Sequence, residues 1–330
     1  MAVEKKLTIV STCTNQKRGS VSGEFHLSKF AGRFHRDSAR AWVTTLEATR
    51  AGIPARDLYL GSHWRESLAC EVSAEEQGID GDLWVLSAGY GLIASSELTT
   101  PYAASFAAGA DSIQNLNWPS DFSPDQKARE WWNLLHRYRK RDGLVRFSIL
   151  AKSRQPLLII LSPEYYNAVE PEIIDLISEG VNVLIVSAGL YRNLNSASPV
   201  VRPHILPFSD SFKQVDDYLN KTNVSLNARL GTWLVRNYSD ALWEGVDTVT
   251  PILREISNRL PAMKRKEVNR MSDDEVMEFI GRNFSGSLNS ATRLLRHLRG
   301  TGRMSCEQKR FGTLFRRYQQ SIQNDLFGHE

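Results

Sequence analysis

The sequence predicts an α/β protein: a largely parallel sheet with flanking helices, followed by a C-terminal all-helical, helix-turn-helix-like module. Short apolar, β-branched runs alternate with amphipathic helical patterns over the first 210 residues, and this alternation is typical of βαβ units. Further along the chain, helix signals and basic residues dominate. We therefore expect an α/β domain over residues 1–250, a linker over 251–271 and a basic helical domain over 272–330.

The expected strands are short apolar runs that end in polar turns. They cover residues 6–13, 82–93, 157–161 and 181–188. The uninterrupted apolar run Leu157–Leu161 is typical of a strand that is buried on both faces. Residues 200–206 form a shorter run, and we expect it at a sheet edge because Pro203 cannot donate a hydrogen bond to a ladder.

Between the strands, apolar residues recur at the 3.6-residue spacing of amphipathic helices. Helices are expected over residues 36–50, from about 65 to 76, over 123–141 and over 171–179. In the first of these, Ala39, Trp42, Val43 and Leu46 form the apolar face. Each helix therefore has one side to bury against the sheet.

Four of the expected strands end in turns that begin with serine. These serines are Ser11, Ser87, Ser162 and Ser187. In open α/β sheets, ligands bind at the carboxyl ends of the strands. The four turns should therefore converge on one site, and since the helices between them do not match, we do not interpret them as an internal repeat.

Two capping-box patterns predict helix starts in the C-terminal region. They are Ser272-Asp-Asp-Glu275 and Ser305-Cys-Glu-Gln308. Between them we expect a helix over residues 287–298, closed by Gly300-Thr-Gly302. Its apolar face consists of Leu294, Leu295 and Leu298, and arginines occupy a neighbouring exposed face. Three short helices joined by glycine-containing turns resemble a helix-turn-helix unit.

Basic residues are concentrated near the C-terminus. Between Phe279 and Asn324, nine lysines and arginines accompany a single acid, Glu307, so this window carries +8 and the rest of the chain −4. Acidic residues at i+4, which a merely solvated basic helix would need, are nearly absent. The asymmetry favours nucleic-acid phosphates as partners. The residues assigned to nucleic acid are Lys17, Arg18, Arg293, Arg296, Arg299, Arg303, Lys309 and Arg310.

Composition and motifs exclude several classes of protein. With 42% hydrophobic and 24% charged residues, the 330-residue chain has an ordinary globular composition, and no run reaches the roughly 18 apolar residues of a membrane span. Cys13, Cys70 and Cys306 fit no metal-binding spacing. No P-loop, GxGxxG, GxSxG or HExxH motif occurs. We expect a cytoplasmic protein with no metal, no cofactor and no membrane partner.

Aromatic and polar residues near the strand ends are candidates for holding a flat ring. The expected base pocket consists of Cys13, Ser87, Tyr90, Tyr102 and Phe106. The three aromatic rings suit stacking on a base, and packing within the loops is the alternative. Asn15 suits reading a base edge through its amide, or stabilising a turn. Cys13 has the chemistry of a nucleophile, but burial as a small hydrophobe fits it equally.

Carboxylates near these turns are candidates for glycosidic chemistry. A glycosidic bond breaks through an oxocarbenium-like state, which a carboxylate stabilises or to which it directs water. The expected catalytic residues are Asp111, Glu164 and Asn15. Asp111 follows the aromatic loop, and Glu164 follows the apolar strand. For each acid the alternative is a solvated surface position.

Several motifs resemble those of the YaaA-like family of bacterial proteins. They are Ser11-Thr-Cys-Thr-Asn-Gln-Lys-Arg-Gly19, Leu86-Ser-Ala-Gly-Tyr-Gly-Leu-Ile93, Pro101-Tyr102 and Asp57-Leu-Tyr-Leu-Gly61. The resemblance covers roughly residues 5–210 and implies an α/β fold, DNA binding and protection from oxidative stress. Together with the basic tail, the chain also resembles prokaryotic defence DNA glycosylases. Ala103 stands where the family often has an acid, and Asp111 is the expected substitute.

These observations predict a DNA glycosylase that flips a modified base, such as a modified cytosine of double-stranded phage DNA, into the strand-end site and excises it. Two alternatives stay open: a non-enzymatic DNA-binding stress protein, and a transglycosylase that exchanges the base. A buried carboxylate with a raised pKa would favour the enzyme. A site filled by Tyr90 and Tyr102 would favour the binding protein. The sequence does not define the oligomeric state.

Overall fold

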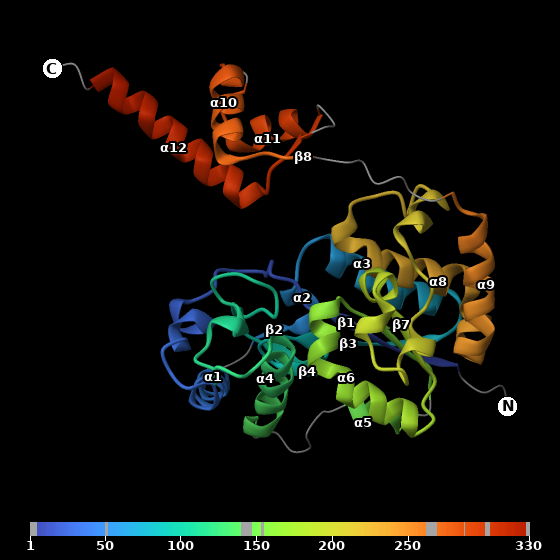
Figure 1. Ribbon diagram of the computed structural model, residues 1–330. Helices are drawn as coiled ribbons and strands as arrows, with labels where there is room; N and C mark the ends of the chain where they lie inside the picture. The colour runs from blue at the N-terminus through green and yellow to red at the C-terminus, as the bar shows by residue number, and fades with distance from the viewer. Residues whose placement is uncertain are drawn as a thin grey trace. The chain divides into compact units, whose positions relative to one another are not determined.

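The computed structural model describes residues 5–49, 52–139, 147–152, 155–261, 269–286, 288–300 and 304–327 (Figure 1). The chain divides into two compact units, Met1–Pro261 and Ala262–Glu330. Among the described residues, no helix has both the length and the apolar character that crossing a membrane requires. Each unit has its own hydrophobic core.

The first unit is built on a five-stranded sheet with the order β4-β3-β1-β6-β7. Its strands are β1 (Lys6–Thr12), β3 (Asp80–Ser87), β4 (Gly91–Ala94), β6 (Leu157–Ile160) and β7 (Val183–Val186). All are parallel except β4, which is antiparallel to β3. At the centre, Ile9 pairs with Leu83 on one side and Leu158 on the other. Every residue of β6 and β7 is buried, so helices cover both faces there. The expected α/β fold with a largely parallel sheet is confirmed.

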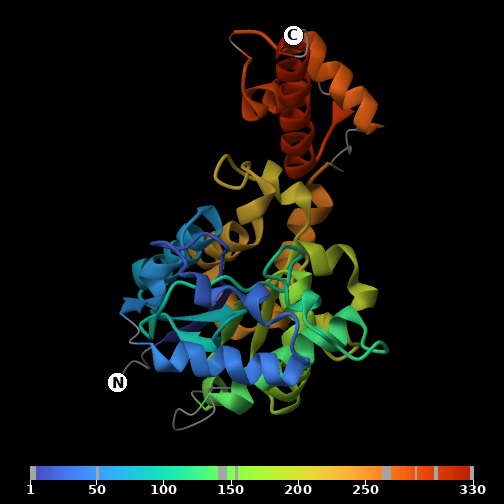
Figure 2. The ribbon, with the colours of Figure 1, turned by 90° about the vertical axis from the view of Figure 1, so that its left-hand side faces the viewer.

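Nine α-helices are described in this unit. They are α1 (His35–Ala48), α2 (Ala55–Leu58), α3 (Ser62–Glu76), α4 (Pro124–Tyr138), α5 (Phe147–Ala151), α6 (Pro163–Ser178), α7 (Ala188–Arg192), α8 (Leu226–Glu244) and α9 (Val246–Arg259). Helices α3 and α8 pack together and lie against β1, β3, β6 and β7. Helices α1, α4 and α6 form a second group, and Figure 2 shows α1, in blue, running across the front of the unit.

Short elements connect these layers. The 3₁₀ helices are η1 (Gly23–Phe25), η2 (Leu27–Phe30), η3 (Ile113–Asn115), η4 (Leu194–Ser196), η5 (Arg202–His204), η6 (Asp210–Gln214) and η7 (Asn223–Ser225). Strands β2 (Ile53–Pro54) and β5 (Leu98–Thr99) form a small antiparallel pair. These connections carry several of the residues that form the site described below.

The expected strand over residues 82–93 is two strands. After Ser87 the chain turns, and β4 returns antiparallel along β3, with Ser87 paired to Gly91. Gly91 has a φ of +77°, a conformation that favours glycine. The turn is fixed by two indole donors, because Trp42 Nε1 donates to the Gly89 carbonyl at 2.9 Å and Trp131 Nε1 to the Ala88 carbonyl at 2.8 Å.

Two other expected elements differ from the structure, one in type and one in its limits. Residues 200–206 contain η5 rather than an edge strand, and Ile205 forms a single bridge to Ile185. Pro203, near the start of η5, lacks the amide proton that a ladder needs. Helix α6 begins at Pro163 and continues through Pro171. In a regular helix the amide of residue 171 would donate to the Asn167 carbonyl, but Pro171 has no amide proton. This carbonyl instead accepts a hydrogen bond from Arg129 Nε at 3.2 Å.

The expected linker over residues 251–271 begins too early. Helix α9 continues to Arg259 because Val249 and Leu253 are fully buried in the core of the first unit. The boundary between the two compact units lies after Pro261.

The second unit consists of α10 (Asp273–Asn283), α11 (Ala291–Gly300), α12 (Gln308–Phe327) and a parallel pair of two-residue strands, β8 (Asn269–Arg270) and β9 (Met304–Ser305). Its buried core consists of Met271, Val276, Ile280, Leu294, Leu295, Leu298, Cys306, Phe311, Leu314 and Phe315. The capping box at Ser272 and Glu275 is present. The second expected cap is wrong, since Ser305 lies in β9 and the Glu307 carboxylate accepts the Arg310 amide at 2.8 Å instead.

Gly89 provides a test of the packing beneath the turn after β3. A Cβ atom at this position would lie 2.5 Å from Cε2 of the fully buried Tyr102 ring. We expect Gly89→Ala to lower the free energy of unfolding by about 1–3 kcal/mol, as overpacking a rigid core does, measured by urea denaturation. Gly109→Ala is the control, because nothing lies within 4 Å of a Cβ there. Equal effects of the two substitutions would contradict this packing.

Candidate functional site

The sheet order defines a topological switch point between β1 and β6. The chain passes from β1 to β3 on one side and later to β6 on the other. Ligands of open α/β sheets bind outside the carboxyl ends of strands at such a point. Two residues meet across it: Cys13, directly after β1, and Tyr165, in the first turn of α6, with Sγ and the phenol oxygen 3.0 Å apart.

A network of hydroxyl groups continues from Cys13. The Tyr102 hydroxyl lies 2.7 Å from Ser87 Oγ and 3.2 Å from the Tyr59 hydroxyl, and it donates to Cys13 Sγ at 3.4 Å. Burial raises the pKa values of Tyr59, Tyr102 and Tyr165 well above their ordinary value. These phenols are therefore protonated donors at neutral pH. We call Cys13, Lys17, Tyr59, Ser87, Tyr102, Asp111 and Tyr165 the strand-end cluster.

The loop after β1 is held against the segment before α3. The Thr14 hydroxyl donates to the Leu60 carbonyl at 2.7 Å, the Leu60 amide to the Gln16 carbonyl at 2.9 Å, and the Arg18 amide to the Leu58 carbonyl at 2.7 Å. Lys17 thereby forms an antiparallel bridge with Tyr59. This pairing fixes the backbone of Lys17 beside the cluster.

The Lys17 side chain lies over the aromatic part of the cluster. Its Nζ is 4.2 Å from the centroid of the Tyr102 ring and donates to the Thr14 carbonyl at 3.1 Å. Burial lowers the pKa of Lys17, and electrostatic interaction with Cys13 and Asp111 opposes this shift in part. Lys17, expected as a loop cation that holds a phosphate, is a half-buried amine that lies over the Tyr102 ring.

Asp111 is oriented by two donors. Its Oδ1 accepts the Ser28 amide at 3.0 Å, and its Oδ2 lies 3.1 Å from His26 Nδ1. Burial acts to raise the pKa of Asp111, but the hydrogen bonds from Ser28 and His26 outweigh it and hold the pKa below its ordinary value. Asp111 is therefore an ionised carboxylate, not a carboxylic acid with a raised pKa.

The aromatic residues of the expected base pocket are packed among other side chains. Tyr102 is fully buried, with the Tyr90 ring 5.3 Å from its own and the Trp42 ring 6.1 Å away. The Tyr90 hydroxyl accepts the Thr100 amide at 2.9 Å. Phe106 is buried with its ring 5.0 Å from that of Tyr165. A site filled by its own aromatic rings is the arrangement that favours a binding protein over an enzyme.

The remaining expected residues of this unit lie on the surface beside the cluster. Asn15 and Arg18 are exposed on the loop after β1, and Glu164 is exposed in the first turn of α6. The elements at the switch point therefore carry two buried phenols, Tyr59 and Tyr102, the partly exposed Tyr165, and an exposed set of polar side chains.

His63 is a site residue that the sequence did not indicate. Its Nε2 lies 3.1 Å from Thr12 Oγ1 and 3.3 Å from Ser11 Oγ, at the end of β1. Burial lowers the pKa of His63 to about 4, so the ring is neutral at pH 7. His63 lies in the first turn of α3, four residues after Tyr59, which also enters the cluster. A lone histidine at such a position gives no sequence signal.

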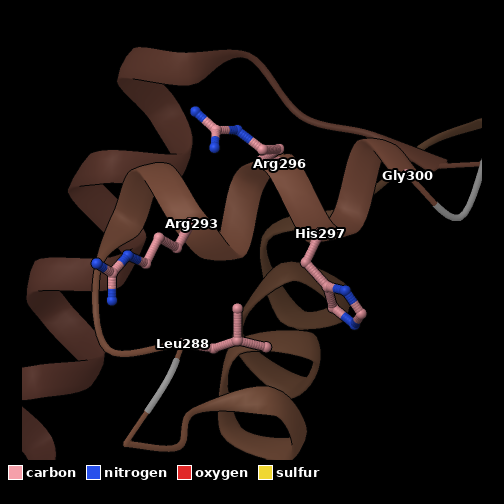
Figure 3. Close-up of a pocket in the computed structure, with 5 residues that line it drawn as sticks. All are labelled: Leu288, Arg293, Arg296, His297 and Gly300. Carbon is pink, nitrogen blue, oxygen red and sulfur yellow. The ribbon is translucent and has the colours of Figure 1, made fainter.

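The second unit presents arginines on the exposed face of α11. Arg293, Arg296 and Arg299 are exposed, while Leu294, Leu295 and Leu298 are buried, so the expected division of this helix is confirmed. An open pocket of about 660 Å³ is lined by Leu288, Arg293, Arg296, His297 and Gly300. Figure 3 shows Leu288 and His297 on the side of α11 away from Arg296. This surface combines positive charge with apolar and aromatic contact area.

Other expected nucleic-acid residues have different positions. Arg310 joins two helices, since its Nε donates to Asp273 Oδ1 at 2.7 Å and its Nη1 to the Met271 carbonyl at 2.8 Å. Arg299 Nη2 reaches the Cys306 carbonyl at 3.4 Å. Arg303 and the side chain of Lys309 lie outside the described residues. Arg310 thus stabilises the unit, and the arginines of α11 form its basic surface.

Protonation of His63 gives a test of the strand-end environment. The native ring has a pKa of about 4, whereas the unfolded chain takes up a proton near pH 6.5. Neutral His63 therefore contributes its full stabilisation above pH 6.5. As the pH falls toward 4, the free energy of unfolding drops by up to about 3 kcal/mol. We expect His63→Gln to flatten this part of the pH dependence in chemical denaturation. The same slope in both proteins would place the proton uptake elsewhere.

No family model, curated protein or solved structure matches this chain. In the part of the chain that the structure describes, no three His, Cys, Asp or Glu side chains are grouped as metal ligands. The likeness to YaaA-like proteins therefore rests on the sequence motifs, and function is inferred from the geometry of the two units.

Proposed function

We propose that this protein is a DNA N-glycosylase, in which the second unit binds phosphates and the strand-end cluster breaks the bond between base and sugar. The observation that carries the proposal is the ionised Asp111 carboxylate, held in one orientation by the Ser28 amide and His26, in the unit whose parallel sheet has its switch point between β1 and β6. Open α/β sheets bind ligands at this position. The excised base would be a modified one, such as a modified cytosine of phage DNA.

Asp111 suits the central step of base excision. As the glycosidic bond breaks, positive charge develops on the sugar, and a fixed carboxylate stabilises it without reorganising. The Ser28 amide and His26 hold Asp111 in one orientation. The departing base gains negative charge, and the protonated, partly exposed Tyr165 is a suitable hydrogen-bond donor to it.

DNA binding is supported by the charge of the C-terminal region. The window from Phe279 to Asn324 carries +8, and α11 exposes Arg293, Arg296 and Arg299 from one short helix. Arginines bind phosphates through charge-assisted hydrogen bonds. Because the target base is stacked inside a duplex, the enzyme would flip it outward before excision.

A second candidate is a DNA-binding protein without base chemistry. The burial of Tyr102 and Tyr90 among other aromatic rings favours it, because a base cannot stack on rings that are packed in this way. On this view the strand-end cluster stabilises the fold, and α11 provides the activity of the protein.

Base release separates the two candidates. Purified protein is incubated with phage DNA that carries modified cytosines and with unmodified DNA, and alkali then breaks the strand at abasic sites. We expect breaks in the modified DNA alone. Asp111→Asn should slow base release by about 10²-fold or more, as the removal of a group that stabilises transition-state charge does. Glu164→Gln tests the second expected acid.

Asp121→Asn is the matched control for Asp111→Asn, since Asp121 is an exposed aspartate ten residues further along the chain, and it should release base at the wild-type rate. Salt-sensitive binding to both DNAs without base release would favour the binding protein. Neither binding nor release would refute both candidates.

The arginines of α11 should determine how DNA binding depends on salt. Replacing Arg293, Arg296 and Arg299 with alanine should weaken binding about equally for all sequences. The slope of log affinity against log salt should fall by about one for each phosphate that the variant no longer neutralises. Titrations by fluorescence anisotropy at several salt concentrations measure this slope.

Arg282→Ala is the control for the arginine substitutions. Arg282 is also exposed in the second unit, but it forms an ion pair with Glu278 on its own helix. Its removal should change the salt slope little. An unchanged slope in the triple variant would remove α11 from the DNA interface.

A further inference from the structure

We propose that Lys17 attacks the sugar, forming a Schiff base with the deoxyribose, so that the protein also cleaves the DNA strand after it removes the base. The inference rests on the proposed function, because it assigns a covalent step to the same site. It changes the role of Lys17 from a phosphate contact to a catalytic nucleophile and adds a lyase activity to base excision.

The position of Lys17 distinguishes it from other lysines of the first unit. Lys5 and Lys6 form surface ion pairs with Asp240 and Asp80. Lys17 Nζ instead donates to the Thr14 carbonyl and lies over the Tyr102 ring, 4.2 Å from its centroid. A carbonyl and an aromatic face hold the amine in place, and the nitrogen gains a lone pair for attack once it loses a proton.

The backbone around Lys17 is fixed, so that the amine has a defined direction. Hydrogen bonds join the loop to residues 58–60 on both sides of Lys17, through the Leu60 and Arg18 amides. Gly61 ends this segment with a φ of +96°, and a Cβ there would lie 2.9 Å from Oε1 of Gln16. A nucleophile needs such positioning, since a misplaced group loses most of its effect.

Burial shifts the amine toward its neutral, nucleophilic form. Burial lowers the pKa of Lys17, which increases the fraction that is unprotonated at neutral pH. The charge of the ionised Asp111 carboxylate acts in the opposite direction and limits the fall in the pKa of Lys17. The position of the amine over the Tyr102 ring, rather than a paired base, defines the nucleophile.

The proposed reaction balances with the groups at the site and water. The Nζ lone pair forms a bond to C1′ as the glycosidic bond breaks, and the base departs with the electron pair and takes up a proton. Lys17 loses its proton to water, the C1′–O4′ bond opens, O4′ takes up a proton, and an iminium forms. Removal of a C2′ proton then expels the 3′ phosphate, and hydrolysis of the iminium frees Lys17.

Cys13 is the competing nucleophile in the cluster. The residue is 9% exposed, and its sulfur lies within hydrogen-bond distance of the Tyr165 and Tyr102 hydroxyls. A thiol that added to C1′ would give a hemithioacetal or an S-glycoside, which borohydride does not convert to a stable adduct, whereas an iminium is reduced to a stable amine. Reductive trapping therefore distinguishes the two nucleophiles.

The test uses a duplex with one aldehydic abasic site, prepared before the protein is added. With sodium borohydride present, we expect a covalent complex with the wild-type protein, and mass spectrometry of its peptides should place the adduct on Lys17. Without borohydride, strand breaks should appear without alkali. Lys17→Arg keeps the positive charge, and it should reduce trapping by about 10²-fold or more.

Lys29→Arg is the matched control, because Lys29 is an exposed lysine of η2 in the same unit, and it should trap like the wild type. An unchanged thermal midpoint for Lys17→Arg shows that the variant is folded. Trapping that persists in Lys17→Arg, or an adduct mapped to another residue, would overturn the inference.

The outcomes separate this inference from the proposed function. Suppose that base is released from modified DNA, that the strand breaks only after alkali, and that no covalent complex is trapped. This outcome would support the glycosylase and refute the lyase. Trapping on Lys17 at a preformed abasic site, without base release from any modified DNA, would establish the lyase step and refute the glycosylase.

Discussion

The hydrogen bonds that join the carboxyl ends of β1, β3 and β6 are the constraint on which the candidate site depends. The Tyr102 hydroxyl links Ser87 after β3 to Cys13 after β1, and Cys13 in turn contacts Tyr165 after β6. Tyr102 comes from a loop, so its position is set by packing against Gly89 and by these bonds. Without them, the loops at the switch point would lack a common anchor, and the amine of Lys17 would lose the ring over which it lies.

The fold could be predicted well from the sequence because its signals are local and periodic. Buried parallel strands are continuous apolar runs, and the turns that follow them begin with serine, which placed Cys13 and Ser87 at one site. The errors have equally local causes. The reversal between β3 and β4 falls inside one apolar run. A proline usually marks a helix start, so Pro171 hid the first half of α6. The helix continues through Pro171 because Arg129 of α4 donates to the Asn167 carbonyl in place of the missing amide.

The composition of the site was less predictable because it depends on contacts between distant segments. Tyr59 and His63 approach β1 only because residues 58–60 pair with the loop after it. Likewise, counting charges does not separate Arg310, which joins α12 to α10, from Arg296, which is exposed on α11. Residue type and spacing predict which chemistry is available, whereas burial and partners decide which residues are free to perform it.

The protonation states in the strand-end cluster are separated in the way that acid–base chemistry requires. Burial favours the neutral forms of both amine and phenol, so it lowers the pKa of Lys17 and raises that of Tyr165. Asp111 escapes this trend, because the Ser28 amide and His26 stabilise its charge. The same cluster therefore holds an ionised carboxylate and an amine whose pKa is lowered by burial. The ionised carboxylate, the amine with a lowered pKa and the protonated phenols are the groups on which the proposed glycosylase depends, whereas the packing of Tyr90 against Tyr102 favours the binding protein.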